Sequence, residues 1–550
     1  METIFFYITF IILIFSSIGH GIIFGKFFNI KADLNIGTYG LLGLANLTLI
    51  SYISVFFFED KSYFNLGLLI LGISYFFNNL KNVNIKKYEI LVILLLSIAI
   101  FISKTHDDFP FYHLQQSLNF SLNKIYIGLH NLDFFYSYHS SILYLNSIFY
   151  LPYFKYNLFN FPNLFVLIFF TLTFINYIFK KKNINLIKYF CLFALIFIVT
   201  KFSRLSEYGT DLAGQLVVTV SIFYLLKIFY SKKIDISEIK IISFLIIFSI
   251  TIKTYFIFYL FLILLTIFTL SYKNSLIFIK SNKFFVLYLF SFISFFFILN
   301  ILTSGCLVFP LAETCFTNLT WSMPLNEVNN YNKWFEAWSK SLAGTGYITE
   351  NYTMFLSDLS WIKIWLNNYF NKYFETILLL LFISIILILS FRPYKIQLKL
   401  SRNYLYLIIF LFLILIFWFL KHPTLRYGGY VIHYSLFSLI ISLIISNTLL
   451  QKEVINRRIK FLIILSLIIF VGKNINRINF ELNREGEYNY NNFPYFYNKM
   501  VQYERIDLGN NILVTFVNSD VCWSSPPPCG GNKNLVGEFK MGYKVINRKK

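Results

Sequence analysis

The densest group of acidic and basic side chains follows the fourth apolar segment of the sequence and contains His106, Asp107, Asp108 and His113. Adjacent carboxylates do not ionise independently, so one of them can keep its proton to unusually high pH and act as a general base. The pair could instead hold a divalent cation, Mg²⁺ or Mn²⁺, or mark only a solvated helix end. Because acid is otherwise scarce nearby, we predict His106, Asp107 and Asp108 as catalytic and His113 as substrate-binding.

A second polar group, with Arg204, Glu207 and Asp211, crowds the boundary between two apolar segments. Charged side chains at such a boundary are typical of the wall of a polar cavity. An ion pair between Arg204 and Glu207 that caps a helix is an equally good interpretation. Lys253 stands alone between two closely joined apolar segments, and we expect it to face a cavity rather than lipid.

A third polar group lies in a short connection between two apolar segments and contains Lys421, His422, Arg426 and Tyr427, followed by two glycines. A guanidinium can bind a phosphate through two parallel hydrogen bonds, and an ammonium adds a point charge. The glycines would let a ligand approach the backbone closely. We therefore predict that this connection binds a phosphate-bearing substrate.

The composition determines where these groups must be placed. Hydrophobic residues make up 57% of the 550 residues and charged residues only 13%, and the mean hydropathy is +0.63. These values exclude a soluble globular enzyme and indicate that most of the chain lies in a lipid bilayer. The net charge of +22 reflects basic loops on one side of a membrane, and no nucleic-acid partner is expected.

Apolar windows of nearly membrane-spanning length recur along the chain. The fourteen windows predict an all-α polytopic membrane protein with about 14 (12–14) transmembrane helices, near 4–24, 37–58, 64–80, 88–103, 161–179, 187–200, 212–230, 241–252, 255–271, 284–303, 375–391, 403–420, 430–449 and 460–472. The first window lacks a basic leader and a cleavage site, so we interpret it as a retained helix.

The positive-inside rule sets the predicted orientation. With the N-terminus outside, the basic connections fall in the cytoplasm, and the long polar segments 104–160, 304–374 and 473–550 fall outside. Residues 114–158 predict one or two helices in the outer interface. The tail from 473 predicts a small α/β domain outside the membrane, with a β-like stretch at 511–517.

Four of the five cysteines lie in these outer segments, and disulfides persist in oxidising compartments. We predict the bridges Cys306–Cys315 and Cys522–Cys529, with four free thiols as the alternative. No P-loop, GxGxxG, HExxH or GxSxG motif is present. ATP-driven transport and lipase-type hydrolysis are therefore disfavoured.

The arrangement resembles the GT-C superfamily of integral-membrane glycosyltransferases. The resemblance is carried by Asp107-Asp108 in the first large outer loop, the interface helices after it, the many spans and the outer tail. It is closest to uncharacterised membrane proteins of bacterial surface-polysaccharide gene clusters, which share His-Asp-Asp-Phe-Pro, Pro-x-x-Arg-Tyr and Cys-Trp…Pro-Cys blocks. The resemblance covers residues 88 to 529. One departure is that three additional spans precede the acidic loop.

The resemblance implies transfer of a sugar from a polyprenyl phosphate or diphosphate donor to a cell-surface glycan or lipid acceptor, on the outer face of a bacterial cytoplasmic membrane. Asp107 or Asp108 would act as the base, and Arg426, Lys421 and Lys253 would hold the phosphate. It also implies three units: a three-helix addition at 1–87, a GT-C-like core at 88–472 and an extracytoplasmic domain at 473–550. A polysaccharide polymerase or ligase and a lipid-linked oligosaccharide flippase remain alternatives.

Overall fold

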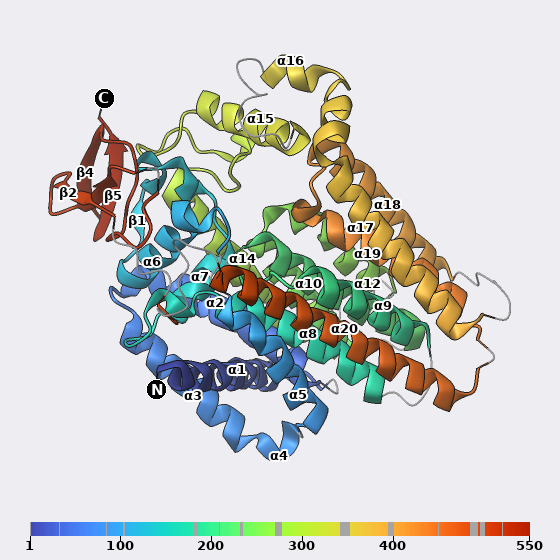
Figure 1. Ribbon diagram of the computed structural model, residues 1–550. Coiled ribbons are helices and arrows are strands. Elements are labelled where there is room, and N and C mark those ends of the chain that lie inside the picture. The colour runs from blue at the N-terminus through green and yellow to red at the C-terminus, as the bar shows by residue number, and fades with distance from the viewer. Residues whose placement is uncertain are drawn as a thin grey trace.

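The computed structural model describes residues 2–31, 34–83, 85–102, 105–180, 185–207, 209–231, 235–269, 278–341, 352–393, 401–448, 450–483, 493–495, 501–519 and 521–549. These residues are mostly helical, with a small region of β-strands near the C-terminus (Figure 1). The strands, α6, α15 and α16 lie at one end of the helix assembly, and the end of α17 and the start of α18 lie at the other.

The N-terminal helices pack closely on one another because small residues lie where they cross. A Cβ added to Gly19 would lie 1.8 Å from the carbonyl oxygen of Gly72, so only glycine allows this backbone approach. The elements of this region are α1 (Glu2–Phe27), α2 (Ile36–Phe57), α3 (Ser62–Asn78), α4 (Leu80–Val83), α5 (Lys87–Leu96) and the 3-10 helix η1 (Ser97–Phe101).

The first long polar segment folds into short, buried elements. These are η2 (Phe109–His113), α6 (Leu114–Leu122), β1 (Tyr126–Ile127), η3 (Leu129–Asn131), η4 (Phe134–Ser137), α7 (Ser141–Ile148) and η5 (Tyr156–Leu158). Two α-helices are present, as predicted for 114–158, but almost all of their side chains are buried in protein. Their polar groups therefore meet protein partners instead of interfacial water; for example, Gln115 donates to the carbonyl oxygens of Trp523 and Ser525, at 2.8 Å each.

Long helices form the centre of the molecule and carry the remaining polar groups at their ends. They are α8 (Phe161–Lys180), α9 (Leu186–Lys201), α10 (Asp211–Ser231), α11 (Ile236–Ile252), η6 (Thr254–Tyr259), α12 (Leu260–Thr269) and α14 (Lys283–Ser304). α8, α9 and α10 are buried along nearly their whole length. They form the core against which the peripheral helices pack.

The elements that follow are η7 (Ala312–Thr314), α15 (Leu325–Ser341), α16 (Tyr352–Ser357), α17 (Trp361–Phe391), α18 (Arg402–Lys421), η9 (Leu425–Gly429), α19 (Tyr430–Ile445) and α20 (Lys452–Leu482). α17 begins fourteen residues before its predicted span, because Trp361, Trp365 and Tyr369 form a buried stripe at helical spacing. α20 likewise continues past residue 472, so its last turns extend beyond the apolar stretch.

Two small sheets complete the fold, built from β1, β2 (Tyr503–Asp507), β3 (Leu513–Val517), β4 (Leu535–Lys540) and β5 (Tyr543–Arg548). β2 and β3 pair antiparallel, as do β4 and β5. β1 pairs parallel with β5, with Tyr126 opposite Lys544 and Ile127 opposite Val545. The C-terminal strands therefore share a sheet with the first long polar segment.

Eight helices in the described part of the chain are long and apolar enough to cross a membrane, and each matches a predicted window. They are α1, α2, α8 with η5, α10, α14, α17, α18 and α19 with η9. The other six windows form helices that are shorter or carry more charge; the window at 88–103, for example, gives only ten α-helical residues before η1. The chain is thus a helical membrane protein.

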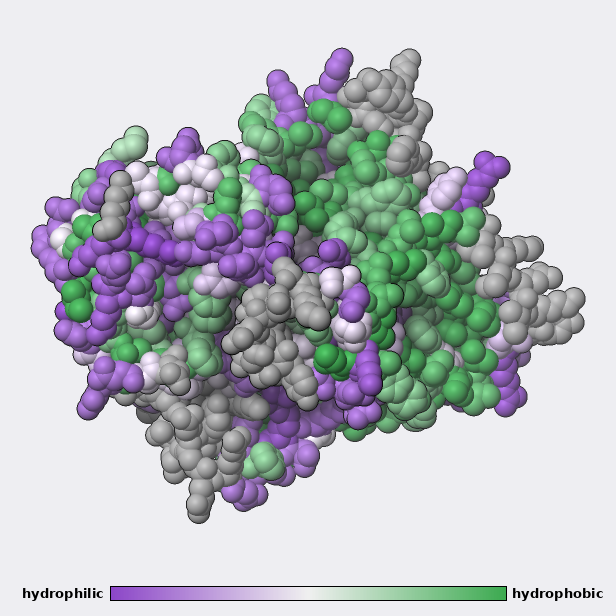
Figure 2. Space-filling model, turned by 90° about the horizontal axis from the view of Figure 1, so that it is seen from above, coloured by the Kyte–Doolittle hydropathy of each residue, from purple (hydrophilic) through white to green (hydrophobic). Residues whose placement is uncertain are grey.

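The surface agrees with this assignment. Apolar side chains are exposed along α14, α17 and α18, with Phe290 65% exposed, Leu389 69% and Leu413 61%. Figure 2 shows a broad hydrophobic surface on the right, where Figure 1 places α17 and α18, and a largely hydrophilic surface on the left, around the strands. An apolar surface of this extent is typical of helices that face lipid.

Candidate functional site

The acidic loop, here residues 105–113, is fixed by backbone hydrogen bonds to distant segments. The His106 N–H donates to the Glu207 carbonyl at 2.9 Å, and the Trp523 N–H donates to the Pro110 carbonyl at 3.2 Å. The loop then continues into the π-helical turn η2. Turns of this type are frequent at functional sites, and this one holds Asp108 at the start of a buried element.

Within the loop, His106 lies beside Asp108. The Asp108 N–H donates to His106 Nδ1 at 3.1 Å, and Nδ1 is 3.4 Å from Asp108 Oδ2. Because Nδ1 accepts that hydrogen bond, a neutral His106 carries its proton on Nε2. His113 is buried, and burial, together with the charge of His106, lowers the pKa of His113 to about 3. The His113 imidazole is therefore neutral at ordinary pH.

Two carboxylates and two cations meet next to this loop, and they come from four separate elements. Lys253 Nζ is 2.7 Å from Asp211 Oδ1, and Arg426 Nε is 3.6 Å from Asp211 Oδ2. Arg426 Nη1 is 3.9 Å from Asp108 Oδ2. We call Asp108, Asp211, Lys253 and Arg426 the central charge cluster. The sequence predicted these residues from three separate polar groups and one isolated lysine, and the structure brings them together.

Local structure explains the positions of Asp211 and Lys253. Asp211 opens α10, where its negative charge suits the helix N-terminus. Lys253 lies between α11 and η6. Burial disfavours the charged form of Lys253, but the charge of Asp211, its hydrogen bond to Lys253 and the neighbouring Tyr427 together outweigh burial and raise the pKa of Lys253. Lys253 therefore stays protonated at the site.

Arg426 is held by the unusual backbone of η9. Gln215, one turn after Asp211, donates to the Arg426 carbonyl at 2.9 Å and accepts from the Val431 N–H at 2.9 Å. Gly428 has a φ of +88°, and a Cβ there would lie 2.9 Å from the Tyr255 ring. Gly428 thus lets the chain turn tightly next to Arg426, and Gly429 allows the helical backbone to lie against the Trp418 ring, 2.7 Å from where a Cβ would be.

Aromatic rings enclose the guanidinium. The Arg426 Cζ atom lies 4.7 Å from the centre of the Trp338 ring and 5.0 Å from that of Tyr427. Arg426 Nη2 donates to the Tyr427 hydroxyl at 3.1 Å, and Lys253 Nζ is 4.6 Å from the centre of the same ring. Tyr427 thereby orients both cations. Trp338 comes from α15.

A second ionic group lies on the other side of the acidic loop. Arg204 donates to both carboxylate oxygens of Glu207, at 2.7–3.1 Å. Arg477 of α20 also pairs with Glu207 and lies 3.9 Å from Glu481. The hydrogen bonds to Glu207 raise the pKa of Arg204, and the charge of the nearby Asp107 contributes in the same direction. The ion pair between Arg204 and Glu207 is thus present.

Two predicted phosphate-binding residues lie apart from the central charge cluster. The Lys421 side chain is half exposed, and its Nζ is 3.4 Å from Glu336 Oε2. His422 Nδ1 is 3.0 Å from the Ser339 hydroxyl, and burial lowers the pKa of His422 to about 4. Both side chains therefore contact α15. Asp107 is exposed.

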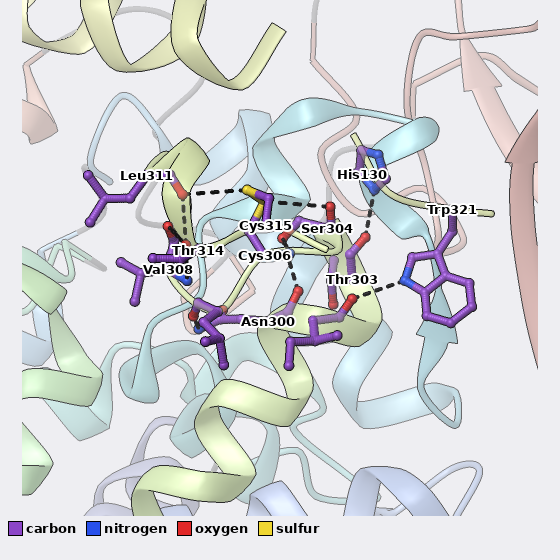
Figure 3. Close-up of a disulfide and its surroundings, with 12 residues drawn as sticks. His130, Asn300, Thr303, Ser304, Cys306, Val308, Leu311, Thr314, Cys315 and Trp321 are labelled. Carbon is purple, nitrogen blue, oxygen red and sulfur yellow. Dashed lines mark hydrogen bonds between the residues drawn. A yellow bond between two sulfur atoms is a disulfide. The ribbon is translucent and has the colours of Figure 1, made fainter. Parts of the chain in front are cut away.

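Both predicted disulfides are confirmed, Cys306–Cys315 and Cys522–Cys529. Figure 3 shows the first at the end of α14, where Trp321 Nε1 donates to the Ile301 carbonyl at 3.0 Å. Nearby, His130 Nδ1 is 2.6 Å from the Thr303 carbonyl oxygen. The second disulfide closes the loop that contains Trp523 and therefore supports the acidic loop from the C-terminal side.

The carboxylates of the site are paired with cations in this structure. In the described part of the chain, no three His, Cys, Asp or Glu side chains gather in a way that could hold a metal ion. Asp108 instead has His106 and Arg426 as its neighbours.

A family model described as a domain of unknown function, DUF8201, matches residues 1–433. The chain belongs to this family. The matched region contains the acidic loop and the whole central charge cluster. No curated protein and no solved structure matches the chain.

In this DUF8201 member, sequence reasoning missed Trp338 and Arg477. Trp338 lies in α15, within the predicted outer segment 304–374, and Arg477 lies in the last turns of α20, within the predicted outer segment 473–550. Helical spacing past the end of the apolar stretch could have suggested that Arg477 faces the protein. The contact between Trp338 and Arg426 joins residues from α15 and η9, which no local pattern relates.

Proposed function

We propose that the chain is a membrane glycosyltransferase. It would move a sugar from a polyprenyl-phosphate-linked donor to a cell-surface glycan or lipid acceptor, on the outer face of the bacterial cytoplasmic membrane. The observation that carries this proposal is the position of the central charge cluster beside one end of an apolar groove. The fourteen-span count and the GT-C-like core belong to the same proposal.

The apolar groove lies between α18 and the segment formed by η6 and α12. Its volume is about 690 Å³, and its walls include Phe258, Phe261, Phe410 and Phe417. Phe258 and Phe417 have ring centres 4.5 Å apart, and those of Phe261 and Phe410 are 4.6 Å apart. The groove has almost no polar lining, as an isoprenoid chain requires.

The groove and the cluster share an element. Lys253 directly precedes η6, and Phe258 lies five residues later, within η6. From Phe417 the groove wall runs down α18 to Tyr406, about 16 Å at a rise of about 1.5 Å per residue. Leu413 on this wall is 61% exposed, so the groove opens to the side of the protein. A lipid tail could enter from the bilayer while its phosphate reaches Lys253 and Arg426.

The proposed chemistry divides among the cluster residues. The acceptor hydroxyl attacks the anomeric carbon of the donor sugar, and the bond from that carbon to the phosphate oxygen breaks. The hydroxyl proton passes to the Asp108 carboxylate, and the phosphate leaves with the bonding electron pair. Arg426 and Lys253 stabilise the negative charge that develops on the phosphate. Asp211 holds the two cations in place.

The decisive test compares surface glycans and lipid-linked glycans of cells that carry the wild type, Asp108→Asn or Arg426→Met. A positioned base is worth about 10²–10⁴-fold in rate, so Asp108→Asn should remove one sugar from the glycan. Arg426→Met should do the same and accumulate the unused lipid-linked donor. Asp107→Asn should retain more transfer than Asp108→Asn, because Asp107 does not contact the cluster cations.

Matched controls are available in exposed residues elsewhere. Asp358→Asn removes an exposed carboxylate, and Lys333→Met removes an exposed cation of α15. Both should leave the glycan unchanged, and membrane levels of all variants are measured by immunoblot. If Asp108→Asn and Arg426→Met reach wild-type levels and leave the glycan intact, the transferase proposal is wrong, and lipid-linked oligosaccharide transport becomes the better hypothesis.

A further inference from the structure

A second cavity, separate from the groove, lies where α20 extends past its apolar stretch. This cleft has a volume of about 480 Å³ and is lined by Arg204 and by the last turns of α20, including Asn476, Arg477, Asn479, Phe480 and Glu481. The spacing of 476, 479, 480 and 483 places these residues along one face of the helix. The α20 side of the cleft thus combines amides and a single aromatic ring with the charged pair Arg477 and Glu481.

The charges of the cleft are balanced within it. Glu207 is bound by Arg204 and by Arg477, and Arg477 also lies near Glu481. Two cations therefore meet two carboxylates, and the cleft has no surplus charge to attract an anion. This distinguishes the cleft from the central charge cluster, where Arg426 and Lys253 lie beside the apolar groove.

The remaining groups of the cleft suit a neutral, hydroxyl-rich ligand. An amide side chain offers both donors and acceptors, which matches the hydroxyl groups of a sugar. The side-chain amides of Asn476 and Asn479 make no hydrogen bond to another described residue, and both side chains are exposed. Phe480 is 68% exposed. It presents a bare aromatic face in a polar cleft, where a sugar ring can pack.

The cleft also lies beside the acidic loop. The His106 N–H donates to the carbonyl of Glu207 at 2.9 Å, so the loop and the Arg204 segment are joined directly. Asp108 Oδ2 is 3.9 Å from Arg426 Nη1, and the neighbouring Asp107 acts electrostatically on Arg204. The loop therefore connects the cationic site next to the apolar groove with the amide-lined cleft.

From this juxtaposition we infer that the α20 cleft binds the acceptor, and that the acceptor is a neutral glycan whose terminal sugar packs on Phe480 and bonds to Asn476 and Asn479. This inference rests on the proposed glycosyltransferase function, because it places the acceptor beside the acidic loop that also borders the donor site. It adds the chemical class of the acceptor, which the central charge cluster does not define.

The test measures binding directly, without turnover. Full-length protein in lipid nanodiscs is titrated with neutral oligosaccharides released by mild acid from the surface glycan of the same cells, and binding is followed by saturation-transfer NMR. Phe480→Ala should weaken binding about tenfold, the loss expected for one aromatic contact of about 1.4 kcal/mol. The double variant Asn476→Ala/Asn479→Ala should weaken it further.

Leu482→Ala is the matched control, because Leu482 is exposed on the same turns of α20 but does not line the cleft. Its affinity should stay within twofold of the wild type. In the transfer assay, Phe480→Ala should raise the KM for the acceptor with little change in kcat. The inference is overturned if the wild type binds no neutral oligosaccharide, if a uronic-acid-containing oligosaccharide binds better, or if the cleft variants bind like the wild type.

Asp108→Asn separates this inference from the proposed function. Its binding should equal that of the wild type while its transfer is lost. Transfer that survives Asp108→Asn would refute the catalytic proposal and leave the glycan-binding cleft standing. Binding that is unaffected by the cleft variants, together with transfer that depends on Asp108, would refute the acceptor site and leave the catalytic proposal standing.

Discussion

The ion pair between Asp211 and Lys253 should contribute strongly to the free energy of unfolding, and a double-mutant cycle can measure it. The Asp211 side chain is 14% exposed and that of Lys253 is 34% exposed, with 2.7 Å between the charged atoms. At an effective dielectric constant of about 20, charges at this distance attract by about 6 kcal/mol, and in bulk water by about 1.5 kcal/mol. The partial exposure of Lys253 places the expected coupling between these limits, at about 2–4 kcal/mol.

The cycle uses Asp211→Asn, Lys253→Met and the double variant of the full-length protein, with unfolding by SDS in mixed micelles. Asp211→Asn should lower the free energy of unfolding more than Lys253→Met, because Asp211 also faces Arg426 at 3.6 Å and its loss removes a partner from both cations. The exposed pair Glu538–Lys540 is the control, because solvent screening leaves such a surface pair with little measurable coupling. A coupling at Asp211–Lys253 no larger than this control would show that water screens the site, and the reasoning about a low-dielectric charge cluster would be refuted.

Substitutions at three further positions test the residues that hold the site in place. Gly428→Ala should destabilise the protein by about 1–3 kcal/mol, because the backbone there has φ +88° and a Cβ would lie 2.9 Å from the Tyr255 ring; thermal unfolding in detergent measures this, and an unchanged midpoint would contradict it. Gln215→Leu should leave the Arg426 carbonyl and the Val431 N–H without their partner, and each loss should lower the free energy of unfolding by about 1–3 kcal/mol. It should also impair transfer more than Gln215→Glu, which keeps an acceptor for the Val431 N–H. His113 has a pKa of about 3 when folded, below the value of about 6.5 expected when unfolded. The contribution of neutral His113 to the free energy of unfolding is therefore fully present above about pH 6.5. It falls by up to about 1.4 kcal/mol per pH unit as the pH decreases toward 3. His113→Asn should make the unfolding midpoint less sensitive to acid over that range, and equal acid sensitivity in both proteins would count against a neutral buried His113.

The main features of the fold followed from apolar windows, because a bilayer-spanning helix needs a long run of apolar residues in sequence. The central charge cluster could be anticipated for a related reason. Asp108, Asp211, Lys253 and Arg426 all stand at the ends of apolar segments, and charges at that depth tend to face the protein interior. The sequence did not reveal that all four meet in one place, since that depends on how the helices are arranged.

Other features have no local signal. β1 has only two residues, and its partner β5 lies about four hundred residues later, so no pattern relates them. The two helices within 114–158 are covered by protein and not by water. The mixture of polar and apolar residues indicates a polar face but not what covers it. The early start of α17 has no signal in the apolar window, because Trp361 and Trp365 precede that window and yet pack inside the protein.

The link between the acidic loop and the second disulfide loop bears on how the protein is made. Gln115 lies 408 residues before Trp523, to which it donates a hydrogen bond. At a synthesis rate of about 5–20 residues per second, the interval between the two is about 20–80 s. During that time Asp108 emerges without the support that fixes it. The arrangement around Asp108 can therefore become complete only after residue 523 has been synthesised and the disulfide loop has docked.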